Sequence, residues 1–335
     1  MHFMRSFCRG LLLTCFAAAT PLILAQESAR TAPDPLLSGK LKTIIAAHHG
    51  KVALFAHQLN TGKFSAIDAD LPVQTASTIK LAMLFHAMNE IAEGKAKWDE
   101  PITLQPGDAV SGSGILNQFD TPLRITLKDV LTMMIELSDN TATNLAIDRF
   151  GVDAVNVRMT DIGLSNTHLY KKVMKPPTGP LPPDQPKFGL GKTTAKEIAD
   201  LATRIGECRL HTDLSLRPTA AEDAVCKVAL NMMTHQFYRN TIPRYLEKLD
   251  SSEGSTAIAS KTGSLDATRS DVAILAGKAG PIVISIYTYQ NADTSWTADN
   301  EGEVTIGKLA REIVDAWSPA GLDSKGMIPG LGLQR

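Results

Sequence analysis

The chain has 335 residues, of which 44% are hydrophobic and 21% charged, a balance typical of a globular protein with a large core. It carries 34 Lys and Arg against 35 Asp and Glu, and both signs are spread along the sequence, without the basic patch that nucleic-acid binding requires. This composition excludes a disordered or fibrous protein and argues against a nucleic-acid partner.

Residues 1–25 have the pattern of an export signal. Arg5 and Arg9 precede an apolar stretch over residues 11–24, and Ala25 offers a small residue for cleavage. An uncleaved or lipid-modified anchor is the alternative. No later stretch approaches the roughly 18 to 20 apolar residues that a membrane span needs. We therefore expect an exported protein, periplasmic or secreted, without a membrane span after cleavage.

The first elements of the mature chain are a helix and a hairpin. Residues 36–50 have a helical pattern that ends at a glycine. The runs 51–59 and 63–69 have strand character and are joined by Asn-Thr-Gly, which predicts a hairpin. Residues 77–93 form a helical pattern with almost no polar face. Such a helix is expected to be central and buried.

The middle of the chain is predicted to be helical apart from one long loop. A Thr-x-x-Asp capping pair opens the helix expected over residues 125–137, and a further helix follows over 141–151. The stretch 171–191 is rich in proline, which disfavours a helix or a central strand. Long loops of this kind are usually functional or mobile. Helical patterning resumes over residues 194–249.

The end of the chain returns to strands. Residues 255–263, 270–277 and 281–290 are β-rich runs, and an amphipathic helix follows over 303–317. Strands near both ends of the chain therefore flank a helical middle. We predict an α+β fold in which one antiparallel five-stranded sheet, flanked by helices, carries an inserted all-α domain.

The expected domain boundaries follow from this pattern. Residues 36–72 and 252–317 would form a discontinuous α/β domain, and residues 73–251 the all-α domain. Residues 318–335 are expected to be a weakly ordered tail. Nothing in the sequence requires more than a monomer.

The cysteines and histidines indicate which disulfide and metal sites the chain can form. Two of the four cysteines lie in the export segment, which leaves Cys208 and Cys226. In an oxidising compartment an even pair is more often a disulfide than two free thiols, and this pair would staple two helices. The histidines show no metal-ligand spacing, so no metal and no cofactor is expected.

Three short motifs stand in order along the chain. They are Ser77-Thr78-Ile79-Lys80, Ser138-Asp139-Asn140 and Lys261-Thr262-Gly263. The first alone is weak, because Ser77 could cap a helix while Lys80 extends into water. All three in this order and these contexts are far more specific. The set resembles the signature of the penicillin-recognising serine enzymes, and among them the class A β-lactamases.

The resemblance covers nearly the whole mature chain and implies a β-lactamase/transpeptidase-like fold. A serine hydroxyl needs a base, and Lys80, one helical turn after Ser77, can serve when neutral. Burial and a second cation lower the pKa of a lysine. By resemblance Lys261 is that cation, and Ser138 relays a proton toward the leaving nitrogen. The expected catalytic residues are Ser77, Lys80 and Ser138.

The resemblance also implies how substrate is held. Asn140 would bind its amide side chain, and the backbone amides of Ser77 and Ser264 would form the oxyanion hole. Gly263 is expected to be glycine because substrate lies against that strand edge. The substrate carboxylate would be held by Thr262, Ser264 and Arg269, for which a plain surface arginine is the alternative. Asp139 is expected to be structural, and Asn144 to support the long loop.

One family residue is missing. Class A β-lactamases carry a loop glutamate that activates the deacylating water, but residues 141–196 contain no glutamate. Matching residues 167–172 to the start of the family's loop puts Val173 at its place. Asp184, or Lys80 acting a second time, could position water, although Asp184 has the surroundings of a turn residue.

Three functions are compatible with this pattern, all with a small-molecule substrate. The favoured one is a β-lactamase-like hydrolase that opens the β-lactam ring through a Ser77 acyl-enzyme, with atypical and slow deacylation. The second is a D-alanyl peptidase or esterase like the penicillin-binding proteins. The third is a protein that binds β-lactams or wall fragments without turnover.

Overall fold

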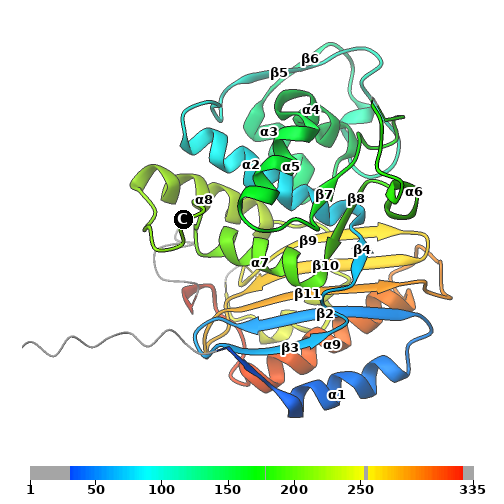
Figure 1. Cartoon of the computed structure of the whole chain (residues 1–335), viewed down its shortest axis with the longest axis vertical. Coiled ribbons are helices and arrows are strands. Elements are labelled where there is room, and N and C mark those ends of the chain that lie inside the picture. The colour runs from blue at the N-terminus through cyan, green and yellow to red at the C-terminus, as the bar shows by residue number, and fades with distance from the viewer. Residues whose placement is uncertain (1–30, 178, 253–255, 327–335) are drawn as a thin grey trace, which may run out of the picture.

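The computed structural model describes residues 31–177, 179–252 and 256–326 (Figure 1). The expected export segment lies outside these residues. Within them, no helix combines the length and apolar character needed to cross a membrane.

A six-stranded sheet forms one half of the molecule, with strands from both ends of the chain (Figure 1). In spatial order the strands are β1 (Ala32–Pro33), β3 (Lys63–Ile67), β2 (Lys51–Gln58), β11 (Ile282–Tyr289), β10 (Thr268–Leu275) and β9 (Ile258–Leu265). The last five pair antiparallel, as predicted. The sheet has one strand more than expected, because the two-residue β1 pairs parallel with β3. A segment this short leaves no alternating pattern in the sequence.

Helices cover both faces of this sheet (Figure 1). On one face lie α1 (Pro35–Ala46) and α9 (Glu301–Trp317), which also contact each other. On the other face α7 (Ala195–Gly206) packs against β2, β10 and β11. Helix α7 is capped by Thr194, whose side chain accepts from the amide of Glu197. It belongs to the middle of the sequence, yet it packs directly on the sheet.

The second half of the molecule is mostly helical. Its main helices are α2 (Lys80–Ala92), α3 (Leu127–Glu136), α4 (Asn140–Phe150), α5 (Val152–Asp161) and α8 (Ala220–Thr234). The inserted region is nevertheless not all-α, because it contains two small antiparallel sheets. These are formed by β4 (Pro72–Gln74), β8 (Gly191–Thr194) and β7 (His168–Leu169), and by β5 (Pro101–Leu104) and β6 (Leu123–Thr126).

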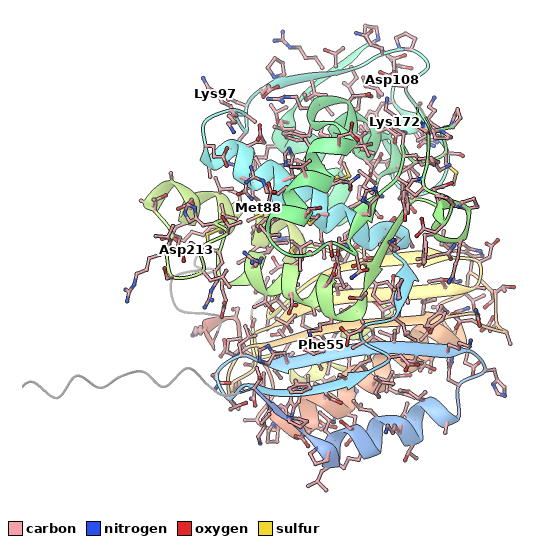
Figure 2. The ribbon with its side chains drawn as sticks, viewed as in Figure 1. Phe55, Met88, Lys97, Asp108, Lys172 and Asp213 are labelled. Atoms are coloured by element: carbon pink, nitrogen blue, oxygen red, sulfur yellow. A yellow bond between two sulfur atoms is a disulfide. The ribbon has the colours of Figure 1, made fainter. Side chains whose placement is uncertain are left out.

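Helix α2 is the central element of this half. Every residue from Lys80 to Asn89 is buried, because neighbouring helices surround it. Figure 2 shows Met88 inside this half, with Lys97 and Asp108 at its outer boundary. The helix is preceded by a 3₁₀ turn, η1 (Ala76–Ile79), rather than starting directly at Ser77.

Three further expectations need correction. The proline-rich stretch 171–191 contains one helical turn, α6 (Gln185–Phe188), because its proline lies in the first turn, where no amide hydrogen bond is lost. The helical pattern expected over residues 194–249 does not continue as α-helix after α8, because residues 235–249 form only the 3₁₀ turns η3 (Ile242–Tyr245) and η4 (Glu247–Leu249). The start of the expected tail is packed, since Ser318 and Leu322 are fully buried. Residues 327–335 lie outside the described part.

A disulfide joins Cys208 to Cys226, with the two Cα atoms 5.7 Å apart. Cys208 follows α7 and Cys226 lies in α8, so the bond links the sheet-covering helix to the helical half. Helix α3 starts with a reciprocal capping box between Thr126 and Asp129, as its sequence indicated.

Candidate active site

The turn that carries Ser77 is pressed against the last strand of the large sheet. Ala76, just before it, has a φ of +46°, which turns the chain sharply into η1. A Cβ on Gly263 of β9 would lie 2.9 Å from the carbonyl oxygen of Thr75 and 3.0 Å from the Ser77 nitrogen. Gly263 is therefore required by the nucleophile's own turn, a different reason from the substrate contact that the sequence suggested. The contact brings the Ser77 amide beside the strand that carries Ser264.

Lys80 is fully buried at the start of α2. Its Nζ donates to the carbonyl oxygen of Ser138 at 2.7 Å, to Ser138 Oγ at 3.1 Å and to Asn140 Oδ1 at 3.2 Å. Burial and the nearby charge of Lys261 lower its pKa well below the ordinary lysine value, against a weaker opposing effect of Asp139. A neutral amine, able to accept a proton, is therefore accessible here.

Lys261 reaches the same hydroxyl from the opposite side. It is fully buried on β9, and its Nζ donates to Ser138 Oγ at 3.0 Å and to the carbonyl oxygen of Thr262 at 2.8 Å. Burial lowers its pKa to about 7, although the carboxylate of Asp271 acts in the opposite direction. Ser138 Oγ thus lies between two amines and can pass a proton between them and a ligand.

Ser77 and Ser138 line one cavity of about 330 Å³. Within the described residues, however, the Ser77 hydroxyl makes no hydrogen bond, and the expected contact with Lys80 is not formed. Lys80 is instead directed at the Ser138-Asp139-Asn140 segment. Catalytic hydrogen bonds are often long or misaligned before substrate binds, so the absence of this bond does not by itself exclude Lys80 as the base for Ser77.

The Ser138-Asp139-Asn140 segment is held by a glycine-containing loop. Asp139 caps α4 at the amide of Ala142, and its other oxygen accepts from two amides of that loop at 2.7 and 2.8 Å. Its role is structural, in agreement with its expected function. Asn140 accepts from Lys80 and donates to the loop at a carbonyl 3.0 Å away.

Ser113 is a cavity-lining residue that the motifs did not reveal. It lies beside Ser77 and Ser138 in the cavity wall. Its neighbours Gly112 and Gly114 have φ of +96° and +104°, and a Cβ on either would collide with the segment just described. The Ser-Gly-Ser-Gly run in the sequence was the available signal.

The long loop is tied to α4 through its backbone. Asn144 donates to the carbonyl oxygen of Val173 at 3.0 Å and accepts from its amide at 2.8 Å, which is the support expected of it. Val173 is 8% exposed and lines a second cavity, of about 700 Å³, that also reaches Ser77. The other apolar residues lining this cavity include Met174, Leu190, Leu265 and Trp296.

Asp184 lies away from the two cavities at Ser77. Its carboxylate pairs with Lys192 at 3.0 Å and accepts from the hydroxyl of Tyr170 at 3.4 Å, and it lines neither of the two cavities at Ser77. This placement gives no support to a water-positioning role for Asp184. Among the described residues there is also no group of three or more His, Cys, Asp or Glu suited to a metal ion.

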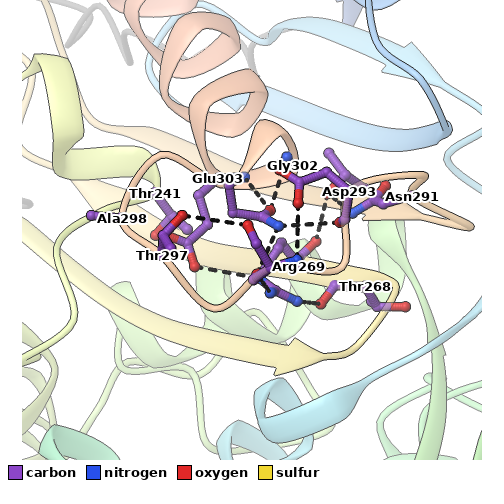
Figure 3. A network of polar contacts seen from close by, with 12 residues as sticks. Thr241, Thr268, Arg269, Asn291, Asp293, Thr297, Ala298, Gly302 and Glu303 are labelled. Carbon is purple, nitrogen blue, oxygen red and sulfur yellow. Dashed lines mark hydrogen bonds and ion pairs between the residues drawn. The ribbon is translucent and has the colours of Figure 1, made fainter.

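Arg269 does not lie where a substrate carboxylate could reach it. It pairs with Ser264 in the strand register, yet its side chain is fully buried. Figure 3 shows Arg269 within a network of polar contacts that includes Thr268 and Glu303. Its guanidinium donates to backbone carbonyl oxygens, among them that of Thr268 at 2.9 Å, and its Nε lies 3.3 Å from Glu303. The ring of Trp296 covers it at 4.7 Å. The expectation that Arg269 binds substrate directly is therefore corrected.

The family follows from a comparison with known proteins. The model of the β-lactamase enzyme family matches residues 36–317. The chain belongs to this family. Among solved structures of the same fold, the β-lactamase of Sphaerobacter thermophilus is 27% identical with a TM-score of 0.70, covering 84% of this chain and 97% of that one. PBP-A is 23% identical with a TM-score of 0.69, covering 86% and 98%.

Other β-lactamase relatives agree on the fold. An ancestral class A β-lactamase is 22% identical, with a TM-score of 0.67 over 84% of this chain and 99% of its own. The β-lactamase regulatory protein BlaB of Streptomyces cacaoi is 29% identical over 102 residues, which are 30% of this chain and 33% of that protein. The match thus spans about a third of this curated relative. The resemblance to class A β-lactamases is confirmed for family and fold.

Proposed function

We propose that this chain is a class A β-lactamase-like serine hydrolase that opens the β-lactam ring through a Ser77 acyl-enzyme and releases the product slowly. The observation that carries the proposal is the convergence of two buried amines, Lys80 and Lys261, on the hydroxyl of Ser138 beside Ser77. Burial of two cations is costly, so a merely structural role offers little reason to keep both.

The acylation step uses these residues in order. Neutral Lys80 takes the proton of Ser77 Oγ, and the oxygen attacks the lactam carbonyl. The backbone amides of Ser77 and Ser264 stabilise the oxyanion. The C–N bond then breaks, and the lactam nitrogen takes a proton from Ser138 Oγ, which is replenished from Lys80. The product is an ester of Ser77.

Hydrolysis of the Ser77 ester needs a water activated by a general base. The loop side of the site offers no carboxylate at the position where the family has one. Val173 is apolar and stands where the family's glutamate is expected. The remaining route is for Lys80 to act a second time, as the general base that activates the water. Because no loop carboxylate assists it, we infer that deacylation is slow. The same feature favours the alternative of a D-alanyl peptidase or esterase, because such enzymes also form the acyl-enzyme without that glutamate.

We also propose that the protein acts outside the cytoplasm. The export pattern of residues 1–25 and the bond between Cys208 and Cys226 support this, since disulfides persist in oxidising compartments.

The test uses the purified mature protein with a chromogenic cephalosporin and with benzylpenicillin. Hydrolysis is followed by absorbance and the protein is weighed by intact mass, with Ser77→Ala as the matched control. We expect an adduct on Ser77 that decays slowly and is absent from the control. A stable adduct together with cleavage of D-alanyl peptides or esters would favour the alternative. Absence of both adduct and hydrolysis would refute the proposal.

A further inference from the structure

Two cavities meet at Ser77 and divide a bound substrate between them. The cavity of about 330 Å³ is lined by Ser138, the proposed proton donor to the leaving nitrogen. The cavity of about 700 Å³ is lined by Asn140, which is expected to bind the amide of the acyl group, and it continues to the long loop. Ser77 lines both cavities. We call the larger one the acyl cavity, because it lies where the acyl group must extend when Ser77 attacks.

The acyl cavity has an apolar rim that is open to solvent. Apolar atoms contribute most of the surface that lines the cavity. Three large apolar side chains of the lining are exposed, Met174 by 65%, Leu265 by 39% and Trp296 by 67%. Single exposed apolar residues need no explanation, but three around one cavity are typical of a ligand-binding groove. An apolar ligand would remove this surface from water, which is favourable.

Met174 places this rim beside the residue that is expected to hold the substrate amide. Its φ of +52° turns the long loop directly after Val173. A Cβ on Gly112 would lie 3.8 Å from Met174 Cε and 2.5 Å from the side-chain nitrogen of Asn140. Met174 and Asn140 thus approach the same glycine, so an acyl chain held at Asn140 passes along the methionine. The unbranched thioether side chain of methionine adapts well to apolar groups.

The charged residues of the acyl cavity are of both signs. Lys171 and Lys172 line it on the loop side, and Asp266 lines it just after the end of β9. Lys172 already pairs with Asp148, and Lys171 donates to the carbonyl oxygen of Lys175 at 3.2 Å. A carboxylate at the end of an acyl chain would be attracted by the lysines and repelled by Asp266, and it would lose the apolar contact. The lining therefore favours an uncharged chain end.

We propose that the acyl cavity selects substrates with a long, uncharged apolar acyl chain, and that Met174 and Leu265 are specificity-determining residues for this chain. The inference rests on the Ser77 acyl-enzyme of the proposed function. Full burial of one methylene corresponds to roughly a fourfold gain in affinity, and an open rim that covers the chain on one side corresponds to roughly twofold. A chain longer by four methylenes should therefore acylate Ser77 roughly tenfold faster.

The experiment compares three penicillins that share one nucleus and carry acetyl, hexanoyl or adipoyl side chains. Hexanoyl is four methylenes longer than acetyl, and adipoyl has the length of hexanoyl but ends in a carboxylate. In each case Ser77 Oγ forms the ester, the lactam C–N bond breaks and the nitrogen takes the proton. The second-order rate of acylation is measured by intact mass and by loss of the β-lactam absorbance. We expect the hexanoyl compound to react roughly tenfold faster than the acetyl compound, and faster than the adipoyl compound.

Variants of the rim isolate the two residues. Met174→Gln and Leu265→Gln keep the approximate length of each side chain and make it polar. Each should lower the hexanoyl-to-acetyl ratio of rates by roughly threefold, and the double variant should bring the ratio close to one. The matched control is Leu216→Gln, because Leu216 is 51% exposed and lines neither cavity at Ser77. This control should leave the ratio unchanged.

The outcomes separate the inference from the proposed function. Equal rates for the hexanoyl and acetyl compounds, or a faster adipoyl compound, would overturn the inference while Ser77 acylation still stands. An unchanged ratio in the double variant of Met174 and Leu265 would overturn it as well. If none of the three penicillins acylates Ser77, the proposed function fails and the inference fails with it.

Discussion

Replacing Val173 by glutamate tests why this active site should release its acyl group slowly. The backbone of Val173 is fixed by both of its hydrogen bonds to Asn144, and its side chain lines the cavity that reaches Ser77. A glutamate there would add a carboxylate to a loop-side wall whose other lining residues include Lys171, Lys172 and Met174 but no acid. A positioned general base contributes typically 10² to 10⁴ in rate. We expect roughly 10², the lower end of this range, because the side chain of Asn144 is already bonded to the backbone of Val173.

The change should also cost stability. Val173 is 8% exposed, so its replacement buries a carboxylate, and we expect a loss of about 1 to 3 kcal/mol in the free energy of unfolding. Part of this is offset by Lys171 and Lys172, which line the same cavity and whose charge favours an ionised carboxylate. The variant should therefore remain folded at room temperature.

The assay separates release from acylation. The protein is acylated with benzylpenicillin, excess drug is removed, and the return of free enzyme is followed by intact mass. Val173→Gln is the matched control, because it has the size of glutamate without a base. If the acyl-enzyme of Val173→Glu decays no faster than that of Val173→Gln, the absent carboxylate is not what limits release.

Three other variants probe the rest of the site and its frame. In Lys261→Met the pKa of Lys80 loses a lowering influence and should rise. The acid limb of the acylation rate, which needs neutral Lys80, should therefore move to higher pH in a pH–rate profile, and an unmoved limb would contradict the coupling. Asn144→Ala removes both anchors of the long loop and should cost about 1 to 3 kcal/mol in urea unfolding, with Asn144→Asp as a milder control. Replacing Cys208 and Cys226 together by serine should lower the free energy of unfolding by about 2 to 4 kcal/mol. If the oxidised wild type is no more stable than the reduced wild type, the disulfide does not stabilise the fold.

The elements at the site could be read from the sequence because their signals are local. The apolar run after Ser77 predicts a buried helix without knowledge of its neighbours, and the structure has it as α2. The late β-rich runs and the early hairpin likewise mark the five antiparallel strands. The motifs were sufficient to bring Lys80, Ser138 and Lys261 together, since the family resemblance carries their spatial relation.

The positions of individual side chains were harder to predict, because they depend on contacts with segments that are distant in sequence. Arg269 lies on β10 opposite Ser264, one residue before the β-rich run that the sequence indicated, and its guanidinium turns into a network built by residues 295–303. No periodicity in the sequence links that segment to β10. Ser113 was missed for a related reason, since only the contact of its flanking glycines with the Ser138-Asp139-Asn140 segment brings it to the cavity.

Acylation and release place different demands on this site. The two amines that serve acylation lie on α2 and β9, and their low pKa values arise mainly from burial. Burial of this kind persists when a substrate fills the cavity, because the amines are already out of water. Release instead requires water to enter beside the acyl ester, and on the loop side it would meet Val173 rather than a base. Faster acylation therefore cannot speed turnover while release is slow, and the rate of the whole cycle should respond to a base added on the loop or to changes at Lys80, the base proposed for release.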